Sequence, residues 1–402
     1  MPQIRRSVYA FFHRYDAPVL HPMDLLRGDV EIKRLPQLLA ISILRGAEFE
    51  ISKDEFALLS ELPSDRWIDV EELPSAQRES VSKLAELGLV LSTDDDPVLA
   101  ELRRKDEQLA QGQWNIYAAL LHSLTTWRDI DLSRHFGENG ELPVPPEGAA
   151  AAFVERHGEP PPHFHRVERA GPSVPLPLIE RDDGLFGSLH KRKTTRAFDR
   201  DAAVTINELG IVLREVFGCR GLAPIADGVA AMKKTSPSGG SLHPIEAYIL
   251  VRRIEGLDPG LYHYRTDNHA LAPLETMTAE EAENLAVQFT CGQTYFATAG
   301  ALVVLAARFR RSFWKYRKHQ RAYGVILLEA GHLSQTLYLV CAELGLAAFV
   351  TAAINGANID ERLEFDPFVE GSLAVCGFGR RARGPSPLEP DFMPYVPPPA
   401  AR

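Results

Sequence analysis

The feature that most constrains the fold is a run of prolines in the middle of the chain. Nine of the 35 residues from 143 to 177 are proline. Because each proline fixes φ and lacks an amide donor, regular structure cannot continue through such a stretch. We therefore expect an N-terminal domain of residues 1–142, a proline-rich linker of residues 143–180, and a C-terminal domain of residues 181–402.

Residues 48–92 of the N-terminal domain show the pattern of a winged helix. Ser52 and Glu55 form a capping box that starts a first helix, and a short extended piece follows at residues 67–70. A second helix is marked by apolar residues at helical spacing, namely Val81, Leu84 and Leu87, up to Gly88. Since this helix carries little net positive charge, peptide or partner binding is favoured over DNA binding or a purely structural cap.

Composition and cysteine usage predict a cytoplasmic globular protein. The apolar content of 45% allows a real core, and the formal charge of −10 argues against a protein that coats nucleic acid. The cysteines show neither a CxxC pattern nor a metal-ligand spacing, so we expect four buried free thiols and no metal: Cys219, Cys291, Cys341 and Cys376. The N-terminus lacks the apolar segment expected of a signal peptide. We also expect no 18-residue apolar span of the kind that crosses a membrane.

The C-terminal domain alternates helical and strand patterns, which indicates an α+β or α/β fold with an internal sheet. Helices are predicted at residues 207–218, 280–288 and 323–344, and strands at 247–251, 301–306 and 373–375. The sequence "VILLEA" in the longest helix is apolar on nearly every side, which predicts a buried helix, and Gly345 is its predicted left-handed cap.

Two segments of this domain have the residue types that bind a flat or anionic ligand. "KKTSPSGGSLHPIEAYILVRR", residues 233–253, presents bare backbone and hydroxyls before a strand. "LHKRKTTRAFD", residues 189–199, alternates cations with threonines, as a phosphate site requires. Taken singly, the first segment is better explained as an ordinary tight turn and the second as a solvated basic patch.

Taken together, the two segments resemble the flavin-dependent nitroreductase fold, and "TSPSGGSLHPIEAYILV" followed by "GLDPGLYHYRTDNHAL" resembles the subgroup of SagB-type dehydrogenases, which mature ribosomally made peptides. The resemblance runs from about residue 185 to residue 384. It implies a mixed sheet flanked by helices, a long central helix, and FMN bound at the interface of a homodimer.

The resemblance also implies which residues bind FMN. The arginine–threonine segment is expected to bind the phosphate and ribityl end of FMN. The serine–glycine loop and the segment after the long helix are expected to contact the flavin ring, and one of two adjacent arginines near the last strand is expected to contact the phosphate. The residues are Arg192, Thr194 and Arg196; Pro237, Ser238 and Gly239; Thr351 and Ala352; and Arg380 or Arg381.

A third basic run, residues 308–324, contains Lys315 and Tyr316. By the same resemblance this pair is catalytic in members that oxidise azolines, a reaction that needs a base for the Cα proton and an acceptor for a hydride. A basic surface run is the alternative reading. His332 and Tyr323 are weaker catalytic candidates, since a histidine in a buried helix is more often a core residue.

The sequence thus predicts an FMN-dependent dehydrogenase that converts azolines to azoles in a modified peptide, with the N-terminal domain binding the leader peptide or a partner enzyme. Two other functions remain open. One is a reductase of alkenes or nitro groups that uses a nicotinamide cofactor, and the other is a docking subunit that has lost its flavin.

Overall fold

The computed structural model describes residues 2–19, 33–133 and 181–384, with isolated residues between 154 and 179 and at 386, 389 and 392. These residues form two compact units. The first contains residues up to 126 together with 308–325 and 366–370, and the second contains 127–307, 326–365 and the residues from 371 onward. Two segments that the proline pattern assigns to the C-terminal domain therefore belong to the first unit. Most of the predicted linker lies outside the described residues.

The first unit contains the helices and strands predicted for residues 48–92. The Ser52–Glu55 capping box is present and starts α2 (Lys53–Glu61). Helix α3 (Ser75–Glu86) follows, and Gly88 after it has a φ of +69°. Strand β1 (Gln3–Arg6) lies between β5 (Ile68–Asp69) and β6 (Val90–Ser92) in a three-stranded sheet. Ile4 packs there with the buried residues of both helices, namely Leu58, Leu59, Val81 and Leu84.

A second sheet of the first unit is absent from the sequence prediction. Its strands are β2 (Ala10–Val19), β3 (Lys33–Ser42) and β4 (Ala47–Glu50), paired antiparallel in that order. Helices α4 (Pro97–Gln111), α5 (Ile116–Thr125) and α11 (Phe309–Phe313) complete the unit. The fully buried Trp114 lies at the centre of an aromatic cluster with His122, Phe309, Phe313, Tyr323 and Phe368.

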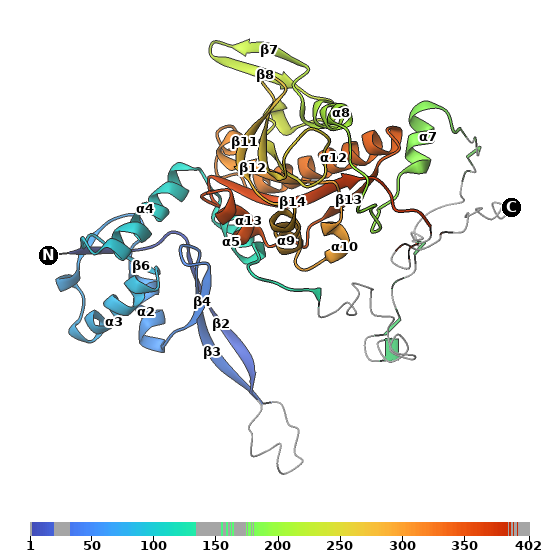
Figure 1. The fold of residues 1–402 in the computed structure, drawn as a ribbon. Coiled ribbons are helices and arrows are strands. Elements are labelled where there is room, and N and C mark those ends of the chain that lie inside the picture. The colour runs from blue at the N-terminus through green and yellow to red at the C-terminus, as the bar shows by residue number, and fades with distance from the viewer. Residues whose placement is uncertain are drawn as a thin grey trace. The chain divides into compact units, whose positions relative to one another are not determined.

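The second unit is built on a six-stranded sheet in the order β11–β10–β9–β12–β14–β13 (Figure 1). The strands are β9 (Ile245–Val251), β10 (Gly260–Arg265), β11 (Ala270–Thr276), β12 (Ala301–Arg308), β13 (Ala347–Thr351) and β14 (Glu370–Gly379). Strands β11, β10, β9 and β12 pair antiparallel in turn, as do β14 and β13. A separate hairpin, β7 (Gly221–Ala226) with β8 (Val229–Lys233), projects beyond the sheet (Figure 1).

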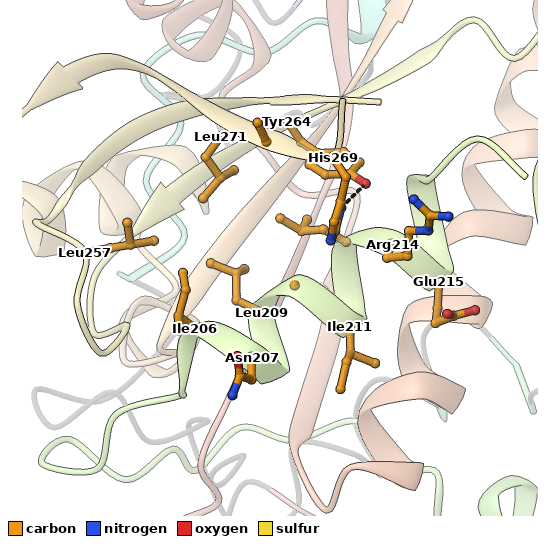
Figure 2. Close-up of a pocket in the computed structure, with 13 residues that line it drawn as sticks. Ile206, Asn207, Leu209, Ile211, Arg214, Glu215, Leu257, Tyr264, His269 and Leu271 are labelled. Carbon is orange, nitrogen blue, oxygen red and sulfur yellow. Dashed lines mark hydrogen bonds between the residues drawn. The ribbon is translucent and has the colours of Figure 1, made fainter. Parts of the chain in front are cut away.

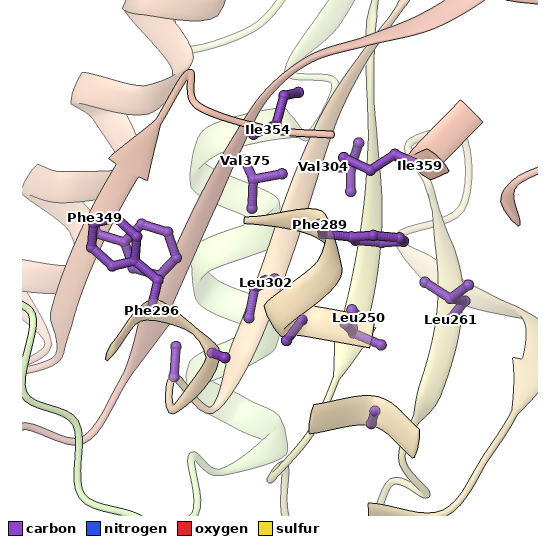
Figure 3. Close-up of a cluster of buried hydrophobic side chains, with 14 of the residues drawn as sticks. Leu250, Leu261, Phe289, Phe296, Leu302, Val304, Phe349, Ile354, Ile359 and Val375 are labelled. Carbon is purple, nitrogen blue, oxygen red and sulfur yellow. The ribbon is translucent and has the colours of Figure 1, made fainter. Parts of the chain in front are cut away.

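Helices cover both faces of this sheet. On one face, α9 (Ala279–Phe289), α10 (Thr294–Ala297) and α13 (Gly356–Arg362) enclose the core shown in Figure 3. Phe296 of α10 stacks on Phe349 of β13 with their ring centroids 3.9 Å apart. Strand residues alternate between faces, so Val375 joins this core while its neighbour Cys376 faces Cys341 of α12 (Ala322–Glu343). Helix α8 (Ile206–Phe217) and the short α7 (Gly184–Lys191) complete the unit.

The six elements predicted for the C-terminal half are all present, and Gly345 ends α12 with a φ of +69°. Two details of the predictions are wrong. Helix α12 is not buried all round, because Leu327 is 42% and Leu328 is 61% exposed in the single chain. Cys219 is only half-buried, whereas the other three cysteines are buried as predicted.

Helix α12 also corrects the expectation that no apolar span occurs. By length and composition it could cross a membrane, with a mean hydropathy of 1.4 over 18 residues. The core helix of a globular protein meets the same criterion, and Leu333, Leu337 and Cys341 are buried within the unit. The cytoplasmic location stays a prediction.

Candidate functional site

The arginine–threonine segment leaves α7 and runs beside strand β13. The Thr195 amide donates to the Ala348 carbonyl over 2.8 Å, which fixes the segment at the edge of the sheet. Within it, Arg192 lies over the ring of Tyr338, 5.4 Å from the centroid, and the Thr194 hydroxyl is 3.0 Å from the Tyr338 hydroxyl. Tyr338 therefore attaches this segment to α12, because its hydroxyl also accepts from the Val350 amide over 3.0 Å.

A cavity of about 200 Å³ opens at this segment. Its polar lining consists of Lys191, Arg192, Lys193, Thr195, Tyr338 and Arg381. Cations at this density beside a hydroxyl are the donor set that a phosphate group takes, since charge-assisted hydrogen bonds from guanidinium groups are the strongest available to it. The cavity is thus a candidate anion site.

Only one of the two adjacent arginines near the last strand lines this cavity. Arg381 donates to the Thr195 hydroxyl over 3.4 Å and pairs with Glu389. Arg380 instead pairs with Glu208 over 2.7 Å. Successive residues of extended chain point in opposite directions, which explains the difference. The geometry favours Arg381, a choice that the sequence leaves open.

Arg196 lies outside the same cavity. Its amide donates to Glu389 over 2.7 Å, and its guanidinium lies near Tyr295 of α10. Burial raises the pKa of the Tyr295 hydroxyl, and the Arg196 cation acts in the opposite direction. A direct contact of Arg196 with a phosphate stays a prediction.

The serine–glycine loop is attached to α12 by three contacts. The Ser236 hydroxyl is 2.7 Å from that of Thr336, the Pro237 carbonyl is 3.2 Å from Nδ1 of His332, and the Ser238 hydroxyl donates to Glu329. Gly239 starts a short 3₁₀ turn, η3 (Gly239–Ser241), in which Gly240 has a φ of +66° and so needs the freedom of glycine. These contacts hold the loop rigidly against the helix.

This loop and the β7–β8 hairpin enclose a second cavity of about 450 Å³. The hairpin contributes apolar residues and Lys233, and the loop contributes Ser236, Pro237, Ser238 and Ser241. Tyr338 follows Glu329 by nine residues, or two and a half turns, so the arginine–threonine segment and the serine–glycine loop contact opposite sides of α12. A single chain therefore does not bring both predicted parts of the flavin site into one cavity.

The remaining predicted flavin contacts lie where β13 ends. Thr351 is buried, and its hydroxyl accepts from the Ala353 amide over 3.1 Å. Ala352 is exposed. The bend after β13 thus presents backbone and one small side chain at the surface of the unit.

Lys315 and Tyr316 lie in the first unit, in the turn that follows α11. Both amides donate to the Ser312 carbonyl, and the Lys315 ammonium lies 5.6 Å from the centroid of the Tyr316 ring. Adjacent side chains on a helix point about 100° apart, whereas adjacent side chains in a turn can face one site. Their catalytic role stays a prediction.

Tyr323, a weaker candidate, has a structural contact in the same unit. Its hydroxyl lies 3.0 Å from Nδ1 of the buried His122, whose Nε2 lies 2.8 Å from the Pro367 carbonyl. Desolvation lowers the pKa of His122 from 6.5 to about 4, so this imidazole is neutral. His332 is likewise engaged with the Pro237 carbonyl rather than with a cavity.

Sequence reasoning missed several residues of these sites. The alternation of charge and hydroxyl in the quoted basic segment includes Lys193 and Thr195, but the resemblance assigns neither of them to FMN. Tyr338 carries no local signal, because only the packing of α12 brings it to the cationic cavity. His243 lies in the quoted serine–glycine stretch, but nothing in that stretch marks it as a lining residue. Glu329 had a signal, since an acidic residue in an apolar helix must have a polar partner.

A larger cavity of about 850 Å³ lies away from both motifs, between α8 and the β10–β11 hairpin (Figure 2). Its lining is mainly aliphatic, with Arg214 and Glu215 at one end. The Tyr264 hydroxyl is 2.8 Å from Nδ1 of His269, so this pair is already satisfied. Volume alone does not make it a reactive site.

Residues 189–380 match the model of the nitroreductase family. One relative is the trifolitoxin-processing protein TfxB of Rhizobium leguminosarum bv. trifolii, 26% identical over 54% of this chain and 58% of its own. Another is the microcin B17-processing protein McbC of Escherichia coli, 27% identical over 37% of this chain and 55% of its own. The chain thus spans little more than half the length of these two relatives.

A solved structure with a similar fold is the Escherichia coli microcin synthetase McbBCD complex with truncated pro-MccB17 bound. The match covers 69% of this chain and 97% of that chain, with 20% identity and a TM-score of 0.47. The family model covers both quoted motifs and the long helix between the second motif and the last strand. Residues 189–380 therefore form a nitroreductase-fold domain, as the two motifs predict.

Proposed function

We propose that the protein is an FMN-dependent dehydrogenase that matures a ribosomally synthesised peptide, and that it oxidises azolines to azoles. The observation that carries the proposal is the cationic cavity in a nitroreductase-fold domain, formed by Arg192, Lys193, Thr195 and Arg381. The names of two relatives, a trifolitoxin-processing and a microcin B17-processing protein, support a peptide as the substrate.

The residues present fit FMN by the chemistry of their donors. Arg192, Lys193 and Arg381 would hold the phosphate, and hydroxyls of the threonines would complete its hydrogen bonds. The serine–glycine loop offers backbone without side chains, which suits a flat ring. Since this loop and the arginine–threonine segment contact opposite sides of α12, we propose that the site is completed in a homodimer, with the loop supplied by a second copy.

The exposed face of α12 is the proposed dimer contact. Leu327 and Leu328 are exposed there beside Gly324, Gly331 and Gln335. Exposed leucines on an otherwise apolar helix are stabilised when a second copy covers them. We also propose that the N-terminal unit binds a leader peptide or a partner enzyme, and that the protein acts in the cytoplasm.

The reaction removes a proton and a hydride from neighbouring carbons of the azoline ring, and a double bond forms between them. When bound, FMN would supply the two-electron acceptor for the hydride, and dioxygen is the proposed final acceptor. We assign the proton to Lys315 and Tyr316, because a lysine side chain can act as a general base and the turn after α11 keeps the tyrosine ring beside its nitrogen.

The visible spectrum of the purified protein, recorded before and after denaturation, tests cofactor binding. Arg381→Ala should weaken FMN binding by about tenfold to a hundredfold, because it removes a charge-assisted hydrogen bond worth about 1.5–3 kcal/mol. Arg380→Ala is the matched control, since its guanidinium pairs with Glu208 outside the cavity. Equal effects of the two variants would contradict the assignment, and a colourless protein that takes up no added FMN would refute the proposed function.

Lys315→Ala tests the chemistry separately. We expect the variant to keep its flavin but no longer to convert azoline peptides to azoles. Mass spectrometry measures the conversion, since each azole formed lowers the mass of the peptide by two hydrogens. Loss of flavin on this change would make Lys315 a binding residue and refute its role as the base.

A further inference from the structure

The third basic run, residues 308–324, concentrates positive charge in one part of the first unit. Seven of the 14 residues from 308 to 321 are arginine or lysine, against 44 of 402 in the whole chain, and residues 308–324 include neither aspartate nor glutamate. The whole chain has a formal charge of −10. The run is therefore a positive patch on a protein that is acidic overall.

Contacts within the first unit hold the backbone of this run in place. Phe309 and Phe313 of α11 are buried, and their ring centroids lie 4.7 Å and 4.8 Å from that of Trp114. Farther along the run, the Lys318 amide donates to the Gln113 carbonyl over 3.0 Å. Because the backbone is attached at these two points, the charged side chains project from a defined surface.

Most cations of the run lie at this surface without a carboxylate partner. Five of them are exposed and form no ion pair with any other residue that the structure describes, namely Arg310, Lys315, Arg317, Lys318 and Arg321. Like charges held close together repel one another, so an anion bound among them relieves the repulsion. Since the backbone is already ordered, a partner would lose little free energy in ordering it.

An exposed tryptophan lies among these cations. Trp314 is 50% exposed. Its amide donates to the Arg310 carbonyl over 2.8 Å, and its carbonyl accepts from Nε of Arg317 over 3.2 Å. Arginine and tryptophan are the residue types that protein-binding surfaces favour, because they combine charge with a large apolar contact.

We propose that these residues form a docking surface for a short acidic segment of the peptide substrate. This docking patch consists of Arg310, Trp314, Arg317, Lys318 and Arg321. The proposed base, Lys315, lies in the same run, so an acidic segment bound here holds the neighbouring azoline near the base. A short peptide fits better than a nucleic acid, because a long polyanion would extend beyond the patch onto a protein of charge −10. The inference rests on the proposed function for the identity of the substrate.

Fluorescence anisotropy of a fluorescein-labelled peptide of alternating glutamate and serine, titrated with the full chain, tests the docking. A matched peptide with glutamine in place of glutamate should bind at least about tenfold more weakly, and added salt should weaken binding of the glutamate peptide. The docking variant combines Arg310→Gln, Arg317→Gln and Arg321→Gln. It should bind the glutamate peptide about tenfold more weakly than the wild type, because three exposed ion pairs are lost.

The control variant removes three exposed cations from other parts of the first unit and should bind like the wild type: Lys53→Gln, Arg66→Gln and Lys105→Gln. Three outcomes would overturn the inference: equal affinity for the two peptides, equal losses in the two triple variants, or tighter binding of a single-stranded DNA with the same number of charges. The docking variant should also keep the unfolding temperature of the wild type. A lower temperature would show that these cations stabilise the fold instead.

Azoline peptides test the link to the substrate. Glutamates beside the azoline should lower KM by about fivefold in the wild type, leave kcat unchanged, and have no effect in the docking variant. The same change of KM in both proteins would contradict the docking patch. The visible spectrum separates this inference from the proposed function. A yellow protein that does not bind the glutamate peptide refutes only the docking patch, and a colourless protein that binds it refutes only the proposed function.

Discussion

Acidification should destabilise the first unit through a single histidine. His122 is 2% exposed within the aromatic cluster of Trp114. The Pro367 carbonyl can only accept from Nε2, so Nδ1 accepts the Tyr323 hydroxyl and the imidazole is neutral. A second proton would have to enter at Nδ1, where it would break the bond from Tyr323 inside an apolar cluster.

The pKa values give the size of this effect. The pKa of His122 is lowered by burial from 6.5 to about 4. The unfolded chain therefore binds one more proton than the folded chain between these two pH values, and the free energy of unfolding decreases as the pH falls through this window. At 1.36 kcal/mol per pH unit, the loss is about 3 kcal/mol, and it is complete near pH 4.

Urea unfolding followed by tryptophan fluorescence would measure it, since Trp114 is buried and lies 5.4 Å from His122 between ring centroids. His122→Gln is the matched variant, because glutamine can donate and accept but does not titrate. The wild type should lose about 3 kcal/mol more than the variant between about pH 6.5 and pH 4. Equal losses in the two proteins would show that His122 is not the responsible group.

Two further predictions concern the second unit. Gly377→Ala should lower the free energy of unfolding by about 1–3 kcal/mol, because the new Cβ would lie 2.2 Å from the ring of Phe349. Gly210 lies in α8, and a Cβ added there would meet only a nitrogen of His269 at 3.8 Å. In the same denaturation assay, Gly210→Ala should therefore raise the free energy of unfolding by up to about 1 kcal/mol. A Gly210→Ala variant less stable than Gly377→Ala would contradict this packing. Glu389→Gln removes the carboxylate that pairs with Arg381, which leaves the arginine free to bind a phosphate. A fluorescence titration should then show FMN binding up to about fivefold tighter than in the wild type. Weaker binding would show that Glu389 helps to form the site.

The elements that sequence reasoning found are those with strong local signals. The capping box at Ser52 and Glu55 places the start of α2, and the left-handed Gly345 places the end of α12. The second sheet of the first unit was missed for a physical reason. Residues 10–19 and 33–42 pair with each other along their whole length, and neither segment alone shows a regular alternation of apolar and polar residues.

Some features of the candidate site likewise have a local sequence signal, and others depend on tertiary contacts. Arg192 and Ser238 could be proposed as site residues from the sequence, because charge, hydroxyl and glycine occur together in short segments. The choice between Arg381 and Arg380 could not, since it depends on which direction each side chain takes from an extended backbone. Nor could the sequence show that the two motifs contact opposite sides of α12, because this depends on the tertiary contacts of Glu329 and Tyr338.

The polar residues of α12 have a structural role in an otherwise apolar helix, because they hold two loops against it. Glu329, His332 and Thr336 recur at three and four residues, so they share one face, and each contacts the serine–glycine loop. Tyr338 lies on the other side and attaches the arginine–threonine segment. A helix with only apolar residues would pack against the sheet equally well but would leave both loops without anchors. The polar positions of α12 thus determine where the two loops lie, while its apolar positions pack against the rest of the unit.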